Sequence, residues 1–244
     1  MEYRFEKERG NYADFASGRV LLNAPGTTAF PVRLASELYL RAREVARKRG
    51  APERLTVYDP CCGGAYWLAT IGLLHGSGIR RLIGSDSDPR AVALANRNLA
   101  MVNVRGLAER AAQLEDLYRQ FGKTSHAEAL ESARRLTELA ERRGFDIETE
   151  CVQADATETL SREARFGVVD LVVADVPYGA VTGWSSQAER PIEAMLEALF
   201  PLLAPHAAAV VVADKKQTVR NSRYRRVERL VIGKRQACIL VPDG

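Results

Sequence analysis

One short segment limits the possible folds of this chain more than any other. Residues 57–64 read Val-Tyr-Asp-Pro-Cys-Cys-Gly-Gly, an apolar strand that ends in an acid and enters a glycine turn. A run apolar enough for a buried helix begins at Tyr66. A strand, a tight turn and a helix N-terminus together direct backbone N–H groups at a ligand. The acid at the strand end favours a cationic or hydroxyl-bearing ligand over a bare pyrophosphate.

Strand and helix patterns alternate along much of the remaining sequence. Strands are predicted at 55–58, 82–85, 147–153, 168–174 and 207–213, and helices at about 31–48, 66–74, 89–99 and 191–203. This order is typical of parallel strands joined by right-handed crossovers. Two apolar runs, Arg226–Ile232 and Arg235–Val241, flank Gly233-Lys234 and predict a C-terminal antiparallel hairpin.

The alternation is interrupted from about residue 105 to 144, where the sequence is charged and helix-forming throughout. Two helices, 107–121 and 126–143, predict a helical hairpin inserted into a single domain of 244 residues. A mostly parallel α/β sheet with a C-terminal antiparallel hairpin is the Rossmann-like plan of class I methyltransferases that use S-adenosylmethionine (SAM). A nicotinamide-dependent dehydrogenase is disfavoured because no G-x-G-x-x-G follows the first strand.

Composition and cysteine usage exclude several classes of protein. The chain is 46% hydrophobic and 27% charged, as in ordinary globular proteins. No stretch approaches the roughly 18 apolar residues of a membrane helix, and the first residues lack the apolar core of a secretion signal. The four cysteines form no C-x-x-C pair, so no metal site is predicted. We therefore expect a cytoplasmic protein without a metal or a membrane partner.

Three acids follow three successive strands, which places them at one edge of the predicted sheet. Asp59 is predicted to reach the methionyl ammonium of SAM, directly or through water. Asp86 is predicted to accept hydrogen bonds from the ribose hydroxyls, whereas Asp88 is better explained as a helix cap. Asp155 is the candidate for the adenine amino group. Open α/β sheets bind ligands at this edge.

Backbone groups complete the predicted cofactor site. The turn at Cys61, Cys62 and Gly63 is expected to pass close to SAM, because small residues let a backbone approach a ligand. The N–H group of Ala156 is expected near a ring nitrogen of the adenine. The alternative is a tight strand-to-helix turn that holds no ligand.

The fourth strand ends in Asp175-Val176-Pro177-Tyr178, which resembles the [Asn/Asp/Ser]-Pro-Pro-[Tyr/Phe] motif of enzymes that methylate nitrogen. In that motif a side-chain oxygen and the next carbonyl accept hydrogen bonds from the target NH₂ group, and the aromatic ring stacks on the substrate. Val176 replaces the first proline but keeps the carbonyl. We assign these four residues to catalysis, and Asp175 also to the cofactor site. A buried strand end with a proline turn is the alternative.

The formal net charge of +4 is modest, but basic residues cluster near the C-terminus. Nine lysines and arginines lie between residues 215 and 235, opposed by a single glutamate. The cluster predicts an RNA-binding surface; a solvated sheet edge is the alternative. The residues predicted to contact RNA are Lys215, Lys216, Arg223, Arg225 and Arg226.

Several motifs together resemble one enzyme family. They are residues 59–63, 121–125 with 133–136, 175–179 with Thr182 and Trp184, 30–35, and 228–230 with 232–233. The chain thereby resembles the AviRa family of ribosomal RNA methyltransferases, associated with resistance to the orthosomycin antibiotic avilamycin. The resemblance implies a SAM-dependent enzyme acting on a guanine of large-subunit rRNA. One departure is Gly64-Ala65, where such proteins more often carry Ser-Gly, which adds a Cβ atom near the expected ligand.

Two other functions stay open on sequence alone. The loop at 175–178 also suits a DNA adenine or protein-glutamine N-methyltransferase. A non-catalytic RNA-binding protein with a degenerate cofactor fold is the second alternative, although the intact acids Asp59, Asp86, Asp155 and Asp175 argue against it.

Overall fold

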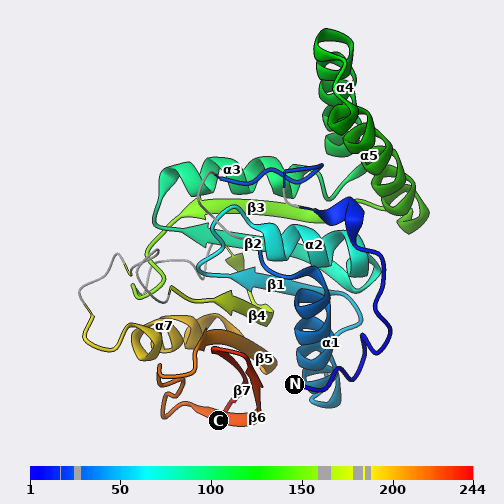
Figure 1. Ribbon diagram of the computed structural model, residues 1–244. Helices are drawn as coiled ribbons and strands as arrows, with labels where there is room; N and C mark the ends of the chain where they lie inside the picture. The colour runs from blue at the N-terminus through cyan, green and yellow to red at the C-terminus, as the bar shows by residue number, and fades with distance from the viewer. Residues whose placement is uncertain (17, 25–28, 159–165, 178–183, 185–187, 244) are drawn as a thin grey trace.

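The computed structural model describes residues 1–16, 18–24, 29–158, 166–177, 184 and 188–243. Its centre is a seven-stranded sheet with the order β3-β2-β1-β4-β5-β7-β6 (Figure 1). The strands are β1 (Leu55–Asp59), β2 (Ile79–Asp86), β3 (Glu148–Gln153), β4 (Val169–Asp175), β5 (Leu203–Asp214), β6 (Tyr224–Ile232) and β7 (Arg235–Pro242). Strands β1 to β5 pair in parallel, and β7 pairs antiparallel with β5 and β6. The predicted mostly parallel sheet with a C-terminal antiparallel hairpin is therefore confirmed.

Helices cover both faces of this sheet. They are α1 (Val32–Lys48), α2 (Tyr66–His75), α3 (Pro89–Ala100), α4 (Val104–Phe121), α5 (Thr124–Arg143) and α7 (Pro191–Leu199), with short 3₁₀ turns η1 (Ala13–Phe15), η2 (Gly76–Gly78) and η3 (Phe200–Leu202). Successive strand residues point to opposite faces. Val57 belongs to the larger core under α1, α2 and α3, whereas Tyr58 belongs to the core under α7. None of the described helices is long and apolar enough to cross a membrane.

Local sequence signals explain where several elements begin and end. The side chain of Asp88 accepts a hydrogen bond from the Arg90 N–H group, and Pro89 occupies the first turn of α3, so the predicted helix cap is confirmed. The helix predicted over 191–203 instead ends at Leu199. Pro201 lies in the 3₁₀ turn that follows, because proline lacks the N–H group that would continue an α-helix. Strand β5 consequently begins at Leu203, four residues earlier than predicted.

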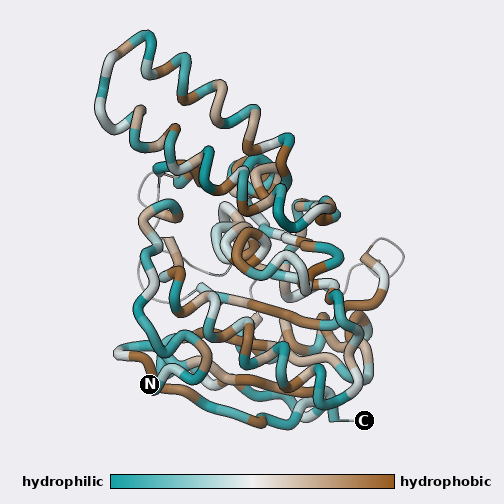
Figure 2. The backbone as a smooth tube through the Cα atoms, turned by 90° about the vertical axis from the view of Figure 1, so that its right-hand side faces the viewer, coloured by the Kyte–Doolittle hydropathy of each residue, from teal (hydrophilic) through white to brown (hydrophobic). Residues whose placement is uncertain are grey.

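The predicted helical insertion is present as the α4–α5 hairpin. Figure 2 shows it projecting from the sheet layers, with teal hydrophilic segments alternating with pale and brown ones along both helices. Gly122 and Gly144 end the two helices in the left-handed conformation that glycine adopts easily. A Cβ atom at Gly106 would lie 2.1 Å from the Ala100 carbonyl oxygen, so only glycine allows α4 to start so close to α3.

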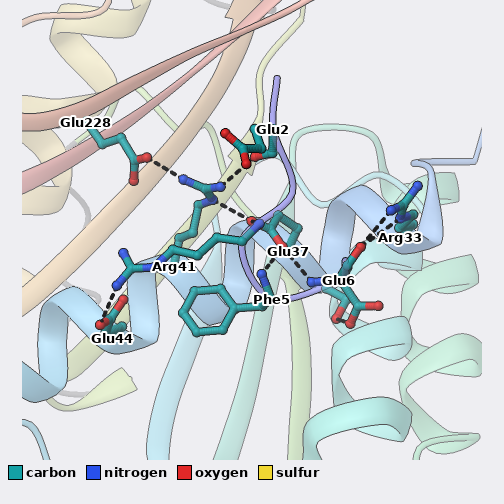
Figure 3. A network of polar contacts seen from close by, with 10 residues as sticks. Glu2, Phe5, Glu6, Arg33, Glu37, Arg41, Glu44 and Glu228 are labelled. Carbon is teal, nitrogen blue, oxygen red and sulfur yellow. Dashed lines mark hydrogen bonds and ion pairs between the residues drawn. The ribbon is translucent and has the colours of Figure 1, made fainter. Parts of the chain in front are cut away.

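The N-terminal arm is fixed to α1 by a buried carboxylate. The backbone N–H groups of Arg4, Phe5 and Glu6 donate to Glu37 at 2.7, 2.9 and 2.8 Å (Figure 3). Arg41 donates to Glu37 at 2.6 Å. Burial opposes the charge, but these donors outweigh it and hold the pKa of Glu37 below its usual value.

The same guanidinium connects the arm to the far edge of the sheet. Arg41 also donates to the Glu2 carbonyl at 2.7 Å and forms an ion pair with Glu228 on β6. The first residues of the chain, α1 and the edge strand therefore share one polar network, drawn in Figure 3.

Replacing Glu37 with glutamine should destabilise the fold by about 2–4 kcal/mol, because Arg41 and the arm's N–H groups lose a buried charged acceptor. Since the pKa of Glu37 is lowered on folding, its stabilisation should be lost as pH falls through that lowered value. Urea denaturation of parent and variant measures both effects. Glu44→Gln is the control on the same helix; its exposed pairs with Arg4 and Lys48 predict a loss below about 1 kcal/mol. Equal losses from the two variants would contradict the assignment.

Candidate active site

Four predicted acids follow the parallel strands at the edge where those strands end, here called the carboxyl edge. Asp59, Asp86 and Asp175 are the last residues of β1, β2 and β4, and Asp155 lies two residues beyond β3. Strand β1 lies between β2 and β4. The chain changes direction across the sheet at this point, which in open α/β sheets creates the crevice where ligands bind.

Backbone hydrogen bonds to both adjoining strand ends shape the turn after β1. The Cys61 N–H group donates to Asp59 at 3.0 Å, and the Cys62 N–H group donates to the Ser85 carbonyl at 2.9 Å. The Gly63 N–H group donates to the Asp86 carboxylate at 2.9 Å. Gly63 has a φ of +52°, and a Cβ atom there would meet nothing within 4 Å. The turn therefore leaves open space beside its backbone, as a close-binding ligand requires.

The departure at Gly64-Ala65 has a structural explanation. Ala65 caps α2 with a φ of 55°, a left-handed conformation that costs a non-glycine residue roughly 1–2 kcal/mol. Its side chain is fully buried in the larger core, not exposed beside the expected ligand. A Cβ atom at Gly64 would lie 2.9 Å from Leu94, so glycine is favoured there by packing. Asn98 donates to the Gly64 carbonyl at 2.7 Å and supports the turn from α3.

Asp59 is buried among other acids. Burial raises its pKa well above the usual value, and the charges of Asp175 and Asp86 raise it further, although the Cys61 N–H group opposes this. A carboxylate in such surroundings is stabilised by a nearby cation. The methionyl ammonium of SAM is a cation of this kind, so the residues present fit the predicted cofactor.

Two more predicted cofactor ligands have local hydrogen-bond partners. Asp86 accepts from the Gly63 N–H group through one oxygen and from the Asp88 N–H group, at 3.0 Å, through the other. Asp155 accepts from the backbone and the hydroxyl of Thr157 at 2.8 and 2.7 Å. Each carboxylate oxygen has two lone pairs, so one hydrogen bond to each oxygen of Asp86 leaves that acid able to accept from a ligand. These contacts fix the orientation of the two side chains.

Two buried cysteines, one of them in the turn after β1, lie next to each other. The Cys62 and Cys151 sulfurs are 3.6 Å apart and both side chains are buried. The hydrogen bond between Cys62 and Cys151, together with burial, raises the pKa of the Cys62 thiol well above its usual value, which disfavours a reactive thiolate. Among the described residues, no group of three or more His, Cys, Asp or Glu side chains could hold a metal ion.

The predicted catalytic loop begins at the end of β4. The Val176 N–H group donates to the Val212 carbonyl at 3.0 Å, which continues the β4–β5 pairing by one residue. The Pro177 carbonyl accepts from the Gln217 side chain at 3.1 Å. Tyr178 lies outside the described residues, as do Gly179 and Thr182. Trp184 packs against the core under α7.

The predicted RNA-binding residues separate into two groups. Strand β6 runs in the same direction as β5, because both pair antiparallel with β7. Lys215 and Lys216 therefore lie at the carboxyl edge, where the Lys215 N–H group donates to the Lys234 carbonyl at 3.0 Å. Arg223 lies at the other end of β6, about 25 Å away for a strand of this length.

Two of the three arginines at that distant end have carboxylate partners. Arg223 pairs with Glu197 at 3.2 Å and lies over the Phe200 ring, and Arg225 is 3.9 Å from Asp243. Arg226 lies beside the buried thiol of Cys238 on the α7 face of the sheet. Within the described part of the chain, Lys215, Lys216 and Lys234 have no ion-pair partner. These three lysines place positive charge at the same edge of the sheet as the four acids.

A cleft of about 450 Å³ adjoins the catalytic loop through Gln217. It lies between the N-terminus of α7 and the connection that follows β5. Its lining residues are Glu189, Arg190, Pro191, Ile192, Glu193, Gln217, Thr218 and Arg220.

Three supporting residues were not predicted from the sequence. Ser85 holds the turn after β1 through its carbonyl, and its hydroxyl shares a 2.7 Å hydrogen bond with Tyr58. Asn98 supports Gly64, and Gln217 contacts the catalytic loop. Ser85 ends a predicted apolar strand, and Asn98 lies within a predicted helix. Their polar side chains in these elements are the sequence signal that could have indicated a supporting role.

Comparisons with known proteins show the family of this chain. The family model described as rRNA methyltransferase AviRa matches residues 1–235. A Streptomyces viridochromogenes protein, 23S rRNA (guanine(2535)-N(1))-methyltransferase, is 38% identical over 241 residues, covering 98% of this chain and 95% of that protein. A solved structure of rRNA methyltransferase AviRa from the same organism has a TM-score of 0.89 at 35% identity, over 99% and 96% of the two chains.

More distant structures show the fold alone. A putative class I SAM-dependent methyltransferase from Listeria monocytogenes is 12% identical with a TM-score of 0.51, over 90% of this chain and 63% of that one. The predicted class I methyltransferase fold is confirmed. From the family model and the 38% identical relative, this chain belongs to the AviRa family of rRNA methyltransferases.

Proposed function

We propose that this protein transfers the methyl group of SAM to N1 of a guanine in 23S ribosomal RNA. The observation that carries the proposal is the 38% identity, over nearly both whole chains, to a 23S rRNA (guanine(2535)-N(1))-methyltransferase. The arrangement of Asp59, Asp86, Asp155 and Asp175 at one sheet edge supports it. A DNA adenine or protein-glutamine substrate has no comparable observation in its favour. The proposed place of action is the cytoplasm, where bacterial ribosomes are made.

The cofactor supplies a methyl group on a sulfonium sulfur, which is a good leaving group. Asp59 holds the methionyl ammonium, and the backbone at Cys61, Cys62 and Gly63 lines the space beside it. Asp86 accepts from the ribose hydroxyls. Asp155 and the Ala156 N–H group face the adenine. Burial of Asp59 strengthens its attraction for the ammonium because little water screens the charges.

The substrate edge of guanine suits the end of β4. N1–H and the 2-amino group are neighbouring donors, and the Asp175 carboxylate and the Val176 carbonyl are acceptors on consecutive residues. A flipped or unpaired base exposes this edge, and Tyr178 is the proposed stacking partner for its face. Methylation at N1 also requires loss of the N1 proton. Asp175 is the ionisable group proposed to accept it.

The large-subunit rRNA is proposed to approach from the carboxyl edge. Lys215, Lys216 and Lys234 supply positive charge there, and the cleft beside α7 adjoins the catalytic loop. Methylation of this guanine is proposed to give resistance to orthosomycin antibiotics such as avilamycin. Expression in a sensitive bacterium, followed by mass mapping of rRNA nucleosides and an avilamycin susceptibility assay, tests both statements. Unmodified rRNA would contradict the methylation, and modified rRNA with unchanged susceptibility would contradict only the resistance role.

Asp59→Asn should weaken SAM binding by about tenfold or more, equivalent to at least about 1.4 kcal/mol. It should also stabilise the ligand-free protein at neutral pH. The pKa of Asp59 is raised on folding, so its ionisation disfavours the folded state as pH rises through that raised value. Calorimetric titration and urea denaturation measure the two effects. Parental SAM affinity in the variant would exclude the ammonium contact.

Asp175→Ala should lower the single-turnover rate of methyl transfer to rRNA by about 10²–10³-fold, by analogy with removal of one positioned group elsewhere. Asp175→Asn should retain more activity if the side chain mainly accepts a hydrogen bond. The asparagine variant should be as slow as the alanine variant if the carboxylate takes the N1 proton. Transfer of labelled methyl groups to 23S rRNA provides the measurement. An alanine variant working at the parental rate would exclude both roles.

Neutralising Lys215, Lys216 and Lys234 together should flatten the salt dependence of rRNA binding by up to about 2 log–log units, at about 0.7 per lost contact. Replacing Arg223, Arg225 and Arg226 is the comparison variant. Two of those arginines already have carboxylate partners, so a smaller change is expected. Filter binding over a salt series measures the slopes. A larger change in slope for the arginine variant would indicate that RNA binds at the end of β6 that carries Arg223.

A further inference from the structure

The side chain of Gln217 joins two strand ends beside the proposed active site. Its amide nitrogen donates to the Pro177 carbonyl at 3.1 Å, and its amide oxygen accepts from the Asp214 N–H group at 2.9 Å. The first contact lies on the catalytic loop after β4, and the second lies at the end of β5. One amide therefore fixes the distance between this loop and the adjoining strand.

Gln217 is itself fixed from a third strand. Gln236 on β7 is buried, and its amide nitrogen donates to the Gln217 carbonyl at 2.6 Å and to the Asp214 carbonyl at 3.1 Å. The amide oxygen of Gln236 accepts from Arg229 at 2.8 Å. Because the backbone of Gln217 is held in this way, its side chain can act as a rigid support.

The contact with Pro177 restrains the one torsion that the local sequence leaves open. The proline ring fixes its own φ near about −65°, and it restricts Val176 to an extended conformation. The Val176 N–H group is bonded to Val212. Rotation about ψ of Pro177 remains. A hydrogen bond to the Pro177 carbonyl opposes that rotation.

We propose that Gln217 is a positioning residue for methyl transfer, which acts by holding the Pro177 carbonyl and thereby fixing the strand end that presents the Asp175 carboxylate and the Val176 carbonyl. This inference rests on the proposed function. Gln217 needs no contact with SAM or guanine for this role. Its loss should therefore slow the reaction without weakening cofactor binding.

Gln217→Glu separates the two contacts of the side chain. A carboxylate keeps an acceptor for the Asp214 N–H group but cannot donate to Pro177, and its charge repels that carbonyl. We expect the single-turnover rate with saturating SAM and rRNA to fall by about 10–100-fold, since small misplacements in an active site have effects of this size. SAM affinity should stay within twofold of the parent. The ratio of variant to parent rate should rise as pH is lowered towards about 4.3, because a protonated glutamate regains a donor.

Asn103→Asp is the matched control, at the base of the helical hairpin. Asn103 also accepts a backbone N–H group and donates to a backbone carbonyl, both of Ile147 at 2.8 Å. The Asn103→Asp variant should have a lower thermal stability, but its rate of methyl transfer per folded molecule should stay at the parental value. Gln236→Glu, which removes the donor to the Gln217 carbonyl, is a second variant if Gln217→Glu folds poorly; a smaller slowing is expected.

The possible outcomes separate a failure of the positioning role from a failure of the proposed methyltransferase function. A slow Gln217→Glu enzyme with parental SAM affinity and a rate ratio that rises at low pH supports the positioning role. A variant with the parental rate, or one whose loss equals its loss of folded protein, overturns that role alone. A parent enzyme that transfers no methyl group to rRNA overturns the proposed function and the positioning role together.

Discussion

Burial of one carboxylate among others at the carboxyl edge is the constraint on which the site depends. Parallel strands bring Asp59, Asp86 and Asp175 to one edge, and burial, followed by the charges of the other two acids, raises the pKa of Asp59. Backbone N–H groups of the turn after β1 offset part of this cost, since Cys61 donates to Asp59 and Gly63 donates to Asp86. A cation bound beside Asp59 would offset more, because a nearby positive charge favours the ionised form of a buried carboxylate.

The same hydrogen bonds make the turn after β1 depend on both β1 and β2. Its conformation requires the Ser85 carbonyl and the Asp86 carboxylate, both from β2, as well as support from Asn98 on α3. Ala65 accepts a left-handed backbone because its side chain is buried in the core under α1 and α2. A change in the packing of either strand, or of the helices behind them, would therefore alter the shape of the turn that a ligand contacts.

Sequence reasoning was most successful where a local pattern determines the structure. Apolar runs, and the polar residues that end them, predict the strand ends at Asp59, Asp86 and Asp175. The same kind of local pattern predicts the helix cap at Asp88. The role of Gln217 could not be predicted, since its partner Pro177 is 40 residues away and nothing in the sequence pairs them. The separation of Lys215 from Arg223 was missed for a related reason: proximity in sequence does not show that Lys215 follows the end of β5 while Arg223 precedes the start of β6, at the opposite edge of the sheet. The function of Tyr178 stays a prediction.

Helix α1 connects these distant parts of the molecule. Its Ala35 carbonyl accepts from Trp67 on α2 at 3.2 Å, next to the cofactor turn. Two turns further along, Arg41 forms an ion pair with Glu228 on the edge strand of the basic hairpin. Because α1 contacts both α2 and β6, it limits how far the β6–β7 hairpin can move relative to the turn after β1. The N-terminal arm, which holds the Glu37 carboxylate beside Arg41, is therefore part of the framework that sets the distance between the proposed RNA surface and the cofactor site.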